Sequence, residues 1–186
     1  MTRSLLVLTV SALTLLASER ADAYDPFGAP PPRWFEGERG FSMKVSAGPS
    51  YRRIYRVDAG GAQIGVAFGG QTGSGGWYGA IRAELGQTDQ GLPIRHLGLG
   101  PTWEAPIGPW RFGFGAHCGI ISIQRASSGA WLTDLTLGGH LFSTVDVYRA
   151  SSYAATVGLF FATEGMDGDD PPQIHHVSAR LGVRFF

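Results

Sequence analysis

The sequence predicts an all-β protein, namely an eight-stranded antiparallel up-and-down transmembrane β-barrel. Three observations lead to this expectation. From Phe41 onward, apolar and polar side chains alternate with a period of two, as in strands with one apolar and one polar face. After the N-terminal apolar run, no segment reaches the roughly 20 apolar residues that a membrane helix needs. Charged residues make up only 16% of the 186 residues, whereas a soluble domain has about a quarter.

The N-terminal segment has the three parts of a secretory signal peptide in the right order. Arg3 supplies a positive charge, an apolar run extends from Leu5 to Leu16, and Ala21-Asp22-Ala23 provides the small residues of a cleavage site. A buried N-terminal helix is the alternative, but the order of the parts favours a cleaved signal. We therefore expect a signal peptide at residues 1–23, a Pro-rich periplasmic tail at 24–40 and the transmembrane β-barrel at 41–186.

Eight alternating segments follow one another and are separated by turn signals. The segments cover residues 41–52, 64–68, 77–85, 96–104, 110–120, 131–141, 153–161 and 176–185. The turn or loop signals between them are Asp58–Gly61, Gln71–Ser74, Asp89–Gly91, Ala105–Gly108, Ala126–Gly129, Tyr148–Ser151 and the acidic run Glu164–Pro172, which is expected to be a solvated loop. The even number of segments and a length near the roughly 10 residues of a tilted membrane strand suit a bilayer-spanning barrel.

The distribution of charges and aromatic rings indicates which face meets lipid. Within the segments every charged side chain falls on the polar face, as required because a charge facing lipid costs about 2–4 kcal/mol at the midplane. If the N-terminus lies in the periplasm, seven aromatic residues of the apolar face fall at the periplasmic ends of the strands, where rings favour the membrane interface. This periplasmic aromatic girdle consists of Phe41, Phe68, Trp77, Trp103, Trp110, Tyr153 and Phe185.

A soluble lipocalin-like barrel is the structural alternative, since it also has eight strands but places its apolar face inside. Here the polar face is rich in Gly and Ser and carries scattered charges, which suits a narrow, filled lumen better than a solvated exterior. Pro49 and Pro101 fall within strands, and a closed barrel has no free edge for a residue that lacks an N–H donor. We therefore expect a bulge or a local break at each proline.

The signal peptide, the eight alternating strands, the short turns and the aromatic C-terminal strand resemble the small outer-membrane barrels of the OmpA, OmpX and OmpW kind. The resemblance covers residues 41–186 and implies a location in the outer membrane of a Gram-negative bacterium, in contact with outer-membrane lipids and lipopolysaccharide. In such proteins the barrel-assembly machinery recognises the C-terminal strand, and Val183, Phe185 and Phe186 look like that signal. A net charge near zero without a basic stretch argues against nucleic acid as a partner.

A polar cluster is expected in the lumen, built from Glu84, His96, His117 and Asp134. A turn centred on Gln90 would place Glu84 beside His96. A pairing of Trp103 with Trp110 across Ala105–Gly108 would place His96 opposite His117.

The cluster has two interpretations. It could be a metal or proton-linked site, since His and carboxylate groups bind zinc and His titrates near neutral pH, or a hydrogen-bonded polar core. No ligand motif of known spacing supports the first, so we expect the second, with no metal and no cofactor. The expected counter-charges are Lys44, Arg52, Arg82, Arg111, Arg180 and Arg184, which would also obstruct a wide pore.

The functional expectation is a non-catalytic outer-membrane barrel with a structural or interaction role and a largely filled polar lumen. A conduit for small apolar molecules, as the OmpW resemblance implies, is the alternative. A lipid A-modifying enzyme is a third hypothesis, because His176-Val177-Ser178 is similar to the His-x-Ser start of such a motif. The next residue is Ala179 instead of Asn, and the pair faces the lumen in this register, so no enzymatic activity is expected.

Overall fold

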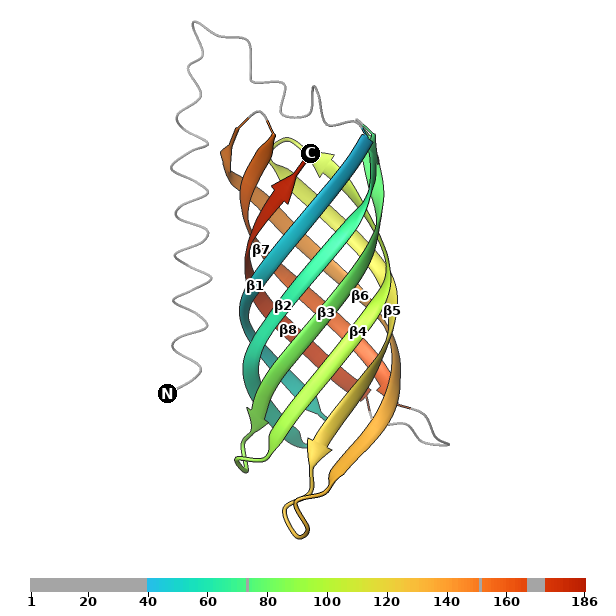
Figure 1. The fold of residues 1–186 in the computed structure, drawn as a ribbon, viewed down its shortest axis with the longest axis vertical. Helices are drawn as coiled ribbons and strands as arrows, with labels where there is room; N and C mark the ends of the chain where they lie inside the picture. Colours follow the sequence, from blue (N-terminus) through green and yellow to red (C-terminus); the bar gives the residue numbers. More distant parts are fainter. Residues whose placement is uncertain (1–39, 73, 151, 167–172) are drawn as a thin grey trace, which may run out of the picture. The chain divides into compact units, whose positions relative to one another are not determined.

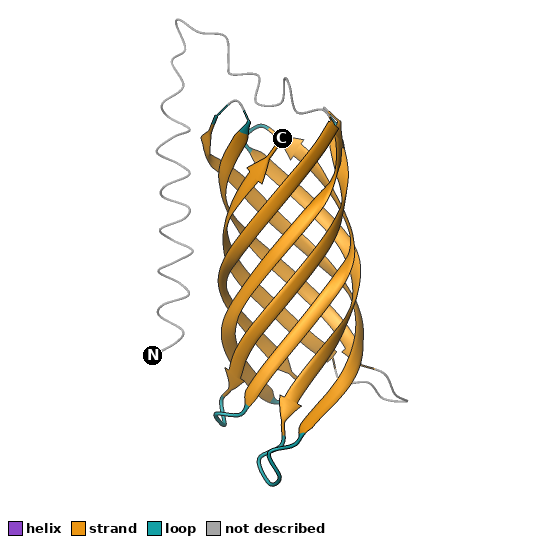
Figure 2. Cartoon of the chain, in the orientation of Figure 1, coloured by secondary structure: helices purple, strands orange, loops and turns teal. Residues whose placement is uncertain are grey.

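Eight antiparallel strands form a closed barrel, with β1 paired to β8. A computed structural model describes residues 40–72, 74–150, 152–166 and 173–186. The strands are β1 (Gly40–Ile54), β2 (Val57–Thr72), β3 (Gly75–Thr88), β4 (Pro93–Ile107), β5 (Trp110–Gln124), β6 (Trp131–Arg149), β7 (Tyr153–Met166) and β8 (Gln173–Phe185). They wrap obliquely around the barrel and each pairs with its neighbours in sequence (Figures 1 and 2). The predicted fold class is confirmed, while the predicted signal peptide and the tail residues 24–39 lie outside the described residues.

The period-two alternation of the sequence gives the two faces of the barrel wall. In β5, for example, Phe112 and Phe114 are exposed on the outside, whereas Arg111 and His117 are buried inside. This division extends around all eight strands, and the wall is closed because an open edge in lipid would leave backbone groups without partners. Within the described residues, no helix has the length and apolarity to cross a bilayer.

One end of the barrel carries the predicted aromatic girdle on its outer face. The seven residues lie where β1, β3, β5 and β7 begin and where β2, β4 and β8 end, which is the same rim. Trp77 pairs with Trp103, and Tyr153 pairs with Phe185. Trp103 also packs against Phe114 with ring centroids 5.3 Å apart. We call this end the girdle end.

The strands are longer than predicted, and their extensions carry charges on the outer face. Arg53, Asp58 and Arg95 lie outside the predicted segments, and their side chains point outward. All three lie close to the turns at the end opposite the girdle. Arg53 Nε lies 3.8 Å from Asp58 Oδ1, and the Arg95 guanidinium lies 4.1 Å from the centroid of the Trp131 ring. The outer face between the two rims carries no charged side chain in the described strands.

Two hairpin turns differ from their predicted positions. The first is formed by Tyr55 and Arg56, since Ile54 pairs with Val57, and Tyr55 adopts the positive φ of 54° that tight hairpin turns require. The predicted Asp58–Gly61 turn is instead part of β2. Gly61 serves close packing there, because a Cβ at this residue would lie 2.3 Å from the carbonyl oxygen of Leu85.

The turn between β4 and β5 is also displaced from its predicted position. It lies at Gly108 and Pro109, with Gly108 at a φ of 59°, since Ile107 pairs with Trp110. Ala105 to Ile107, which were predicted to turn, continue the strand. This displacement changes the pairing of every residue along β4 and β5.

Both strand prolines interrupt one neighbouring ladder, as expected. The pairing of β1 with β8 skips Gly48 and Pro49, and that of β4 with β5 skips Gly100 and Pro101. The register is the same on both sides of each gap, so these are local breaks without an inserted residue. Among the described strands, the one register shift lies between Asp146 and Tyr148 in β6.

The end of the lumen opposite the girdle is filled by apolar side chains, which the sequence analysis did not anticipate. We call this group the apolar cap. It consists of Ile54, Ala59, Ile94, Ile121 and Ile174, with Ile123 and Met166 packed against it. Ile121 and Ile174 are fully buried. The lumen is therefore polar in its middle and closed by hydrocarbon at this end.

The close approach of β2 to β3 gives a test of the wall. A Cβ at Gly69 would lie 1.9 Å from the carbonyl oxygen of Trp77, whereas a Cβ at Gly70 would meet nothing within 4 Å. We expect Gly69→Ala to lower the free energy of unfolding by about 1–3 kcal/mol, as overpacking does. Gly70→Ala should change it far less. Urea titration of both variants refolded into lipid vesicles measures the difference, and equal stabilities would contradict this packing.

Candidate functional site

The centre of the lumen is crossed by an arginine held between two glutamates. Arg52 Nη2 lies 2.9 Å from Glu84 Oε2, and Arg52 Nη1 lies 3.3 Å from Glu164 Oε1. The side chains come from β1, β3 and β7, so these ion pairs tie distant parts of the wall together across the lumen. All three are buried, with Arg52 completely inaccessible to solvent. Buried charges need such partners because their desolvation is costly.

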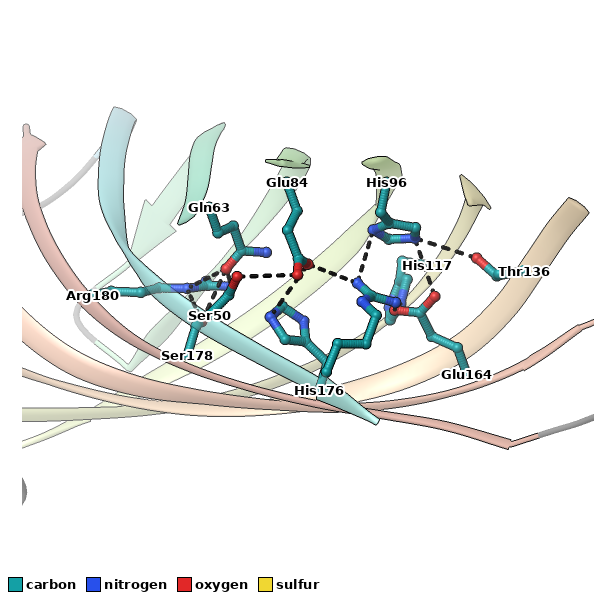
Figure 3. A network of polar contacts seen from close by, with 11 residues as sticks. Ser50, Gln63, Glu84, His96, His117, Thr136, Glu164, His176, Ser178 and Arg180 are labelled. Atoms are coloured by element: carbon teal, nitrogen blue, oxygen red, sulfur yellow. Dashed lines mark hydrogen bonds and ion pairs between the residues drawn. The ribbon is translucent and has the colours of Figure 1, made fainter. Parts of the chain in front are cut away.

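Two histidines complete the surroundings of the Glu164 carboxylate. His96 Nε2 lies 3.1 Å from Oε2, and His117 Nε2 lies 3.1 Å from Oε1 (Figure 3). Arg52 Nη2 donates to His96 Nδ1 over 3.1 Å, which makes Nδ1 the acceptor and leaves the Nε2 N–H near both the Thr136 hydroxyl and the Glu164 carboxylate. Glu164 is thus the point at which β1, β4 and β5 are linked to β7.

Glu84 is held in a similar way on the other side of Arg52. Ser50 Oγ donates to Glu84 Oε1 over 3.0 Å, and His176 Nε2 lies 3.5 Å from Glu84 Oε2. We refer to Arg52, Glu84, Glu164, His96, His117 and His176 as the central network. Its members derive from six of the eight strands, which makes it a cross-brace of the barrel.

A second set of ion pairs lies nearer the girdle end. Glu104 contacts both Lys44 and Arg111, the latter at 3.2 Å between Nη1 and Oε1. Asp146 Oδ2 lies 2.7 Å from Arg184 Nη2. The predicted counter-charges Lys44, Arg52, Arg111 and Arg184 therefore each meet a carboxylate.

Between the central network and the girdle end, the lumen contains a cavity of about 90 Å³. Arg82, Arg180, His140 and Phe160 lie on its wall, together with the Lys44–Glu104 pair. The wall of this cavity is much more cationic than anionic.

Three of the four residues predicted to form the lumen cluster lie close together. Glu84 pairs with His96 across β3 and β4, as expected from a turn centred on Gln90. His96 is paired with Ile121, so the prediction that it lies opposite His117 is wrong. The two histidines are instead brought together by Glu164. The displaced β4–β5 turn explains the difference.

Asp134 is not part of the cluster. It is exposed in the first part of β6, before Thr136. This part has no partner in β7, because the pairing of the two strands begins with Thr136 and Met166. Glu164 takes the place of the missing carboxylate, although the sequence analysis assigned it to an acidic loop. The period-two alternation of β7 could have placed Glu164 in the lumen, because Phe160, Ala162 and Glu164 are successive inward positions.

The chemistry available in this cluster is ion pairing and hydrogen bonding. In the part of the chain that the structure describes, no group of three or more His, Cys, Asp and Glu side chains has the arrangement to hold a metal ion. His176 and Ser178 of the His-x-Ser sequence are both buried in the lumen. Ser178 Oγ donates to Gln63 Oε1 over 2.9 Å, so this hydroxyl already has a partner.

The sequence matches no protein-family model and no curated protein. Solved structures do match. The neisserial surface protein NspA superposes with a TM-score of 0.59 at 13% identity, over 78% of this chain and 96% of that chain. The attachment invasion locus protein Ail of Yersinia pestis matches with a TM-score of 0.49 at 9% identity, over 78% of this chain and 99% of that chain. The N-terminal β-barrel domain of Pseudomonas aeruginosa OprF matches with a TM-score of 0.44 at 16% identity, over 77% and 96%.

The superposition on NspA establishes a shared fold. The predicted resemblance to the small bacterial outer-membrane barrels is confirmed at this level: the chain has their closed, eight-stranded, all-antiparallel architecture. Sequence identity this low carries no information about the role of the lumen residues.

The central network predicts a large effect of removing one charge from the lumen. Glu164→Gln leaves Arg52 with half of its carboxylate partners and removes the acceptor charge beside both histidines. We expect the free energy of unfolding to fall by about 3–5 kcal/mol, as when one partner of a buried ion pair is lost. Asp58→Asn, in the exposed pair with Arg53, should cost at most about 1 kcal/mol. Denaturant titration in vesicles compares the two, and similar losses would show that the network does not brace the barrel.

Proposed function

We propose that this protein is a non-catalytic outer-membrane barrel with a sealed lumen, which acts as a structural or interaction element of the membrane. The observation that carries the proposal is the Arg52 guanidinium held between Glu84 and Glu164 at the centre of the lumen. An ion that crossed the barrel would have to break these pairs and then pass the apolar cap. Both barriers lie on the only route through an eight-stranded barrel, whose interior is just wide enough for side chains.

The outer surface supports a location in the outer membrane. Its middle is uncharged and apolar, one rim carries aromatic rings, and the charged residues Arg53, Asp58 and Arg95 lie at the other rim. This is the depth profile that a bilayer selects, since charges are tolerated near the interfaces and costly at the midplane. We infer export through a cleaved signal peptide, contact with outer-membrane lipids and lipopolysaccharide, and recognition of β8 by the barrel-assembly machinery.

The surface that remains for an interaction role is the end opposite the girdle. There the hairpin of β5 and β6 projects beyond the neighbouring turns (Figure 1). The apolar side chains exposed on this hairpin are Trp131, Leu132 and Leu135. They lie in the part of β6 before Thr136, which is not paired with β7. Exposed apolar groups on a projecting hairpin are typical of binding surfaces.

The two other hypotheses have less support. A conduit for small apolar molecules would have to lead past the charged central network, where an apolar molecule would displace ion pairs and gain no compensating contact. A lipid A-modifying activity would need His176 and Ser178 to reach lipid, whereas both are enclosed by the wall. Incubation of the purified protein with lipid A tests this third hypothesis, and release of an acyl chain would reject our proposal.

Planar-bilayer recording tests the sealed lumen. We expect no steady current through the native barrel. The double variant Arg52→Ser, Glu164→Ser should show more frequent current steps, because it removes the main obstruction between the cavity and the apolar cap. The matched control Arg53→Ser, Asp58→Ser removes an ion pair at the outer rim and should remain silent. A steady ohmic current through the native protein would refute the proposal.

A further inference from the structure

Two lumen arginines contact no carboxylate of the residues that the structure describes. Within the described residues, neither the Arg82 nor the Arg180 guanidinium lies within 4.0 Å of an Asp or Glu oxygen, in contrast to the other inward-facing cations. Their hydrogen bonds go to neutral groups. Arg82 Nη2 donates to His140 Nδ1 over 3.3 Å, and Arg180 donates to Gln63 Oε1 over 2.7 Å from Nη2 and 3.2 Å from Nε.

The two cations are held close to each other by one aromatic ring. The centroid of the Phe160 ring lies 4.7 Å from Arg82 Cζ and 3.6 Å from Arg180 Cζ. Each guanidinium is attracted to the ring, but the two positive charges repel one another in a site of reduced dielectric. Phe160 is fully buried and Arg82 is 5% exposed, so water screens this repulsion poorly.

Both arginines line the cavity between the central network and the girdle end. Its volume of about 90 Å³ leaves room for several waters or for one small polyatomic ion. Lys44 and Arg184, which are paired with Glu104 and Asp146, also line the cavity, and the hydroxyls of Thr102 and Thr156 supply further donors. Arginine forks bind oxyanions well because they present several N–H donors in a plane.

We propose that this cavity is a binding site for a small inorganic oxyanion of the phosphate or sulfate type, held between Arg82 and Arg180. The anion supplies a negative charge in contact with these two guanidinium groups, which no carboxylate of the described residues does within 4.0 Å. A metal cation is repelled by the same wall. The site does not depend on whether the lumen is sealed, since it lies on the girdle side of the central network.

Thermal unfolding of the refolded protein in a non-ionic detergent tests the proposal, with inorganic phosphate as the probe at constant ionic strength. A ligand that binds only the folded state raises the unfolding temperature with its concentration. We expect a rise of about 5–10 °C when phosphate reaches a hundredfold excess over its dissociation constant. The double variant Arg82→Gln, Arg180→Gln should lose this rise. Arg53→Gln, which changes an exposed arginine at the opposite rim, should retain it.

Two further measurements distinguish an anion in the cavity from a lipid effect and from a folding defect of the variant. Phosphatidylglycerol added to the micelles without free phosphate should leave the unfolding temperature unchanged, because the barrel wall separates lipid headgroups from the cavity. Crystals of the unmodified chain soaked in selenate should show an anomalous selenium peak in contact with both guanidinium groups, which needs no variant to fold. The proposal is overturned if native protein and double variant respond equally to phosphate, if the lipid alone reproduces the rise, or if no selenium peak lies in the cavity.

Discussion

The enclosure of charge is the constraint on which the rest of this structure depends. A strand that crosses a bilayer can carry ionisable side chains only on the face turned away from hydrocarbon. In this barrel that face is a narrow lumen, so the charges are forced into contact with one another. Arg52, Glu84 and Glu164 meet there because the wall leaves them no other environment.

The same constraint turns the lumen into the stabilising core of the protein. A soluble domain of this size packs apolar side chains inside, whereas here apolar packing inside the barrel is limited largely to the cap around Ile121 and Ile174. Cross-strand ion pairs and hydrogen bonds stabilise the rest of the lumen. Where the chain supplies fewer carboxylates than cations, as around Arg82 and Arg180, the balance has to come from a ligand or from water.

The sequence predicted the faces of the strands well and their ends poorly. Alternation fixes a face, so the inward positions of Glu84, His96 and His117 followed directly from parity. Turn chemistry was ambiguous: Gly61 allows close packing inside β2, while Tyr55 takes a positive φ at the actual turn. A misplaced turn shifts the whole register between β4 and β5. Glu164 was missed because its acidic neighbours resemble a loop. Its position nevertheless falls on the same face of β7 as Phe160.

Accessibility measurements along β4 test the central claim most directly. With Cys118 replaced by Ala, each residue from 95 to 105 is changed in turn to a spin-labelled cysteine in the vesicle-reconstituted protein, and collisions with oxygen and with a water-soluble nickel chelate are recorded. The account predicts a period of two, with labels at positions 97, 99, 101 and 103 exposed to oxygen dissolved in lipid and those at 96, 98, 100 and 102 shielded from it. A pattern without alternation, or one with the odd positions open to the chelate at mid-depth, would contradict it.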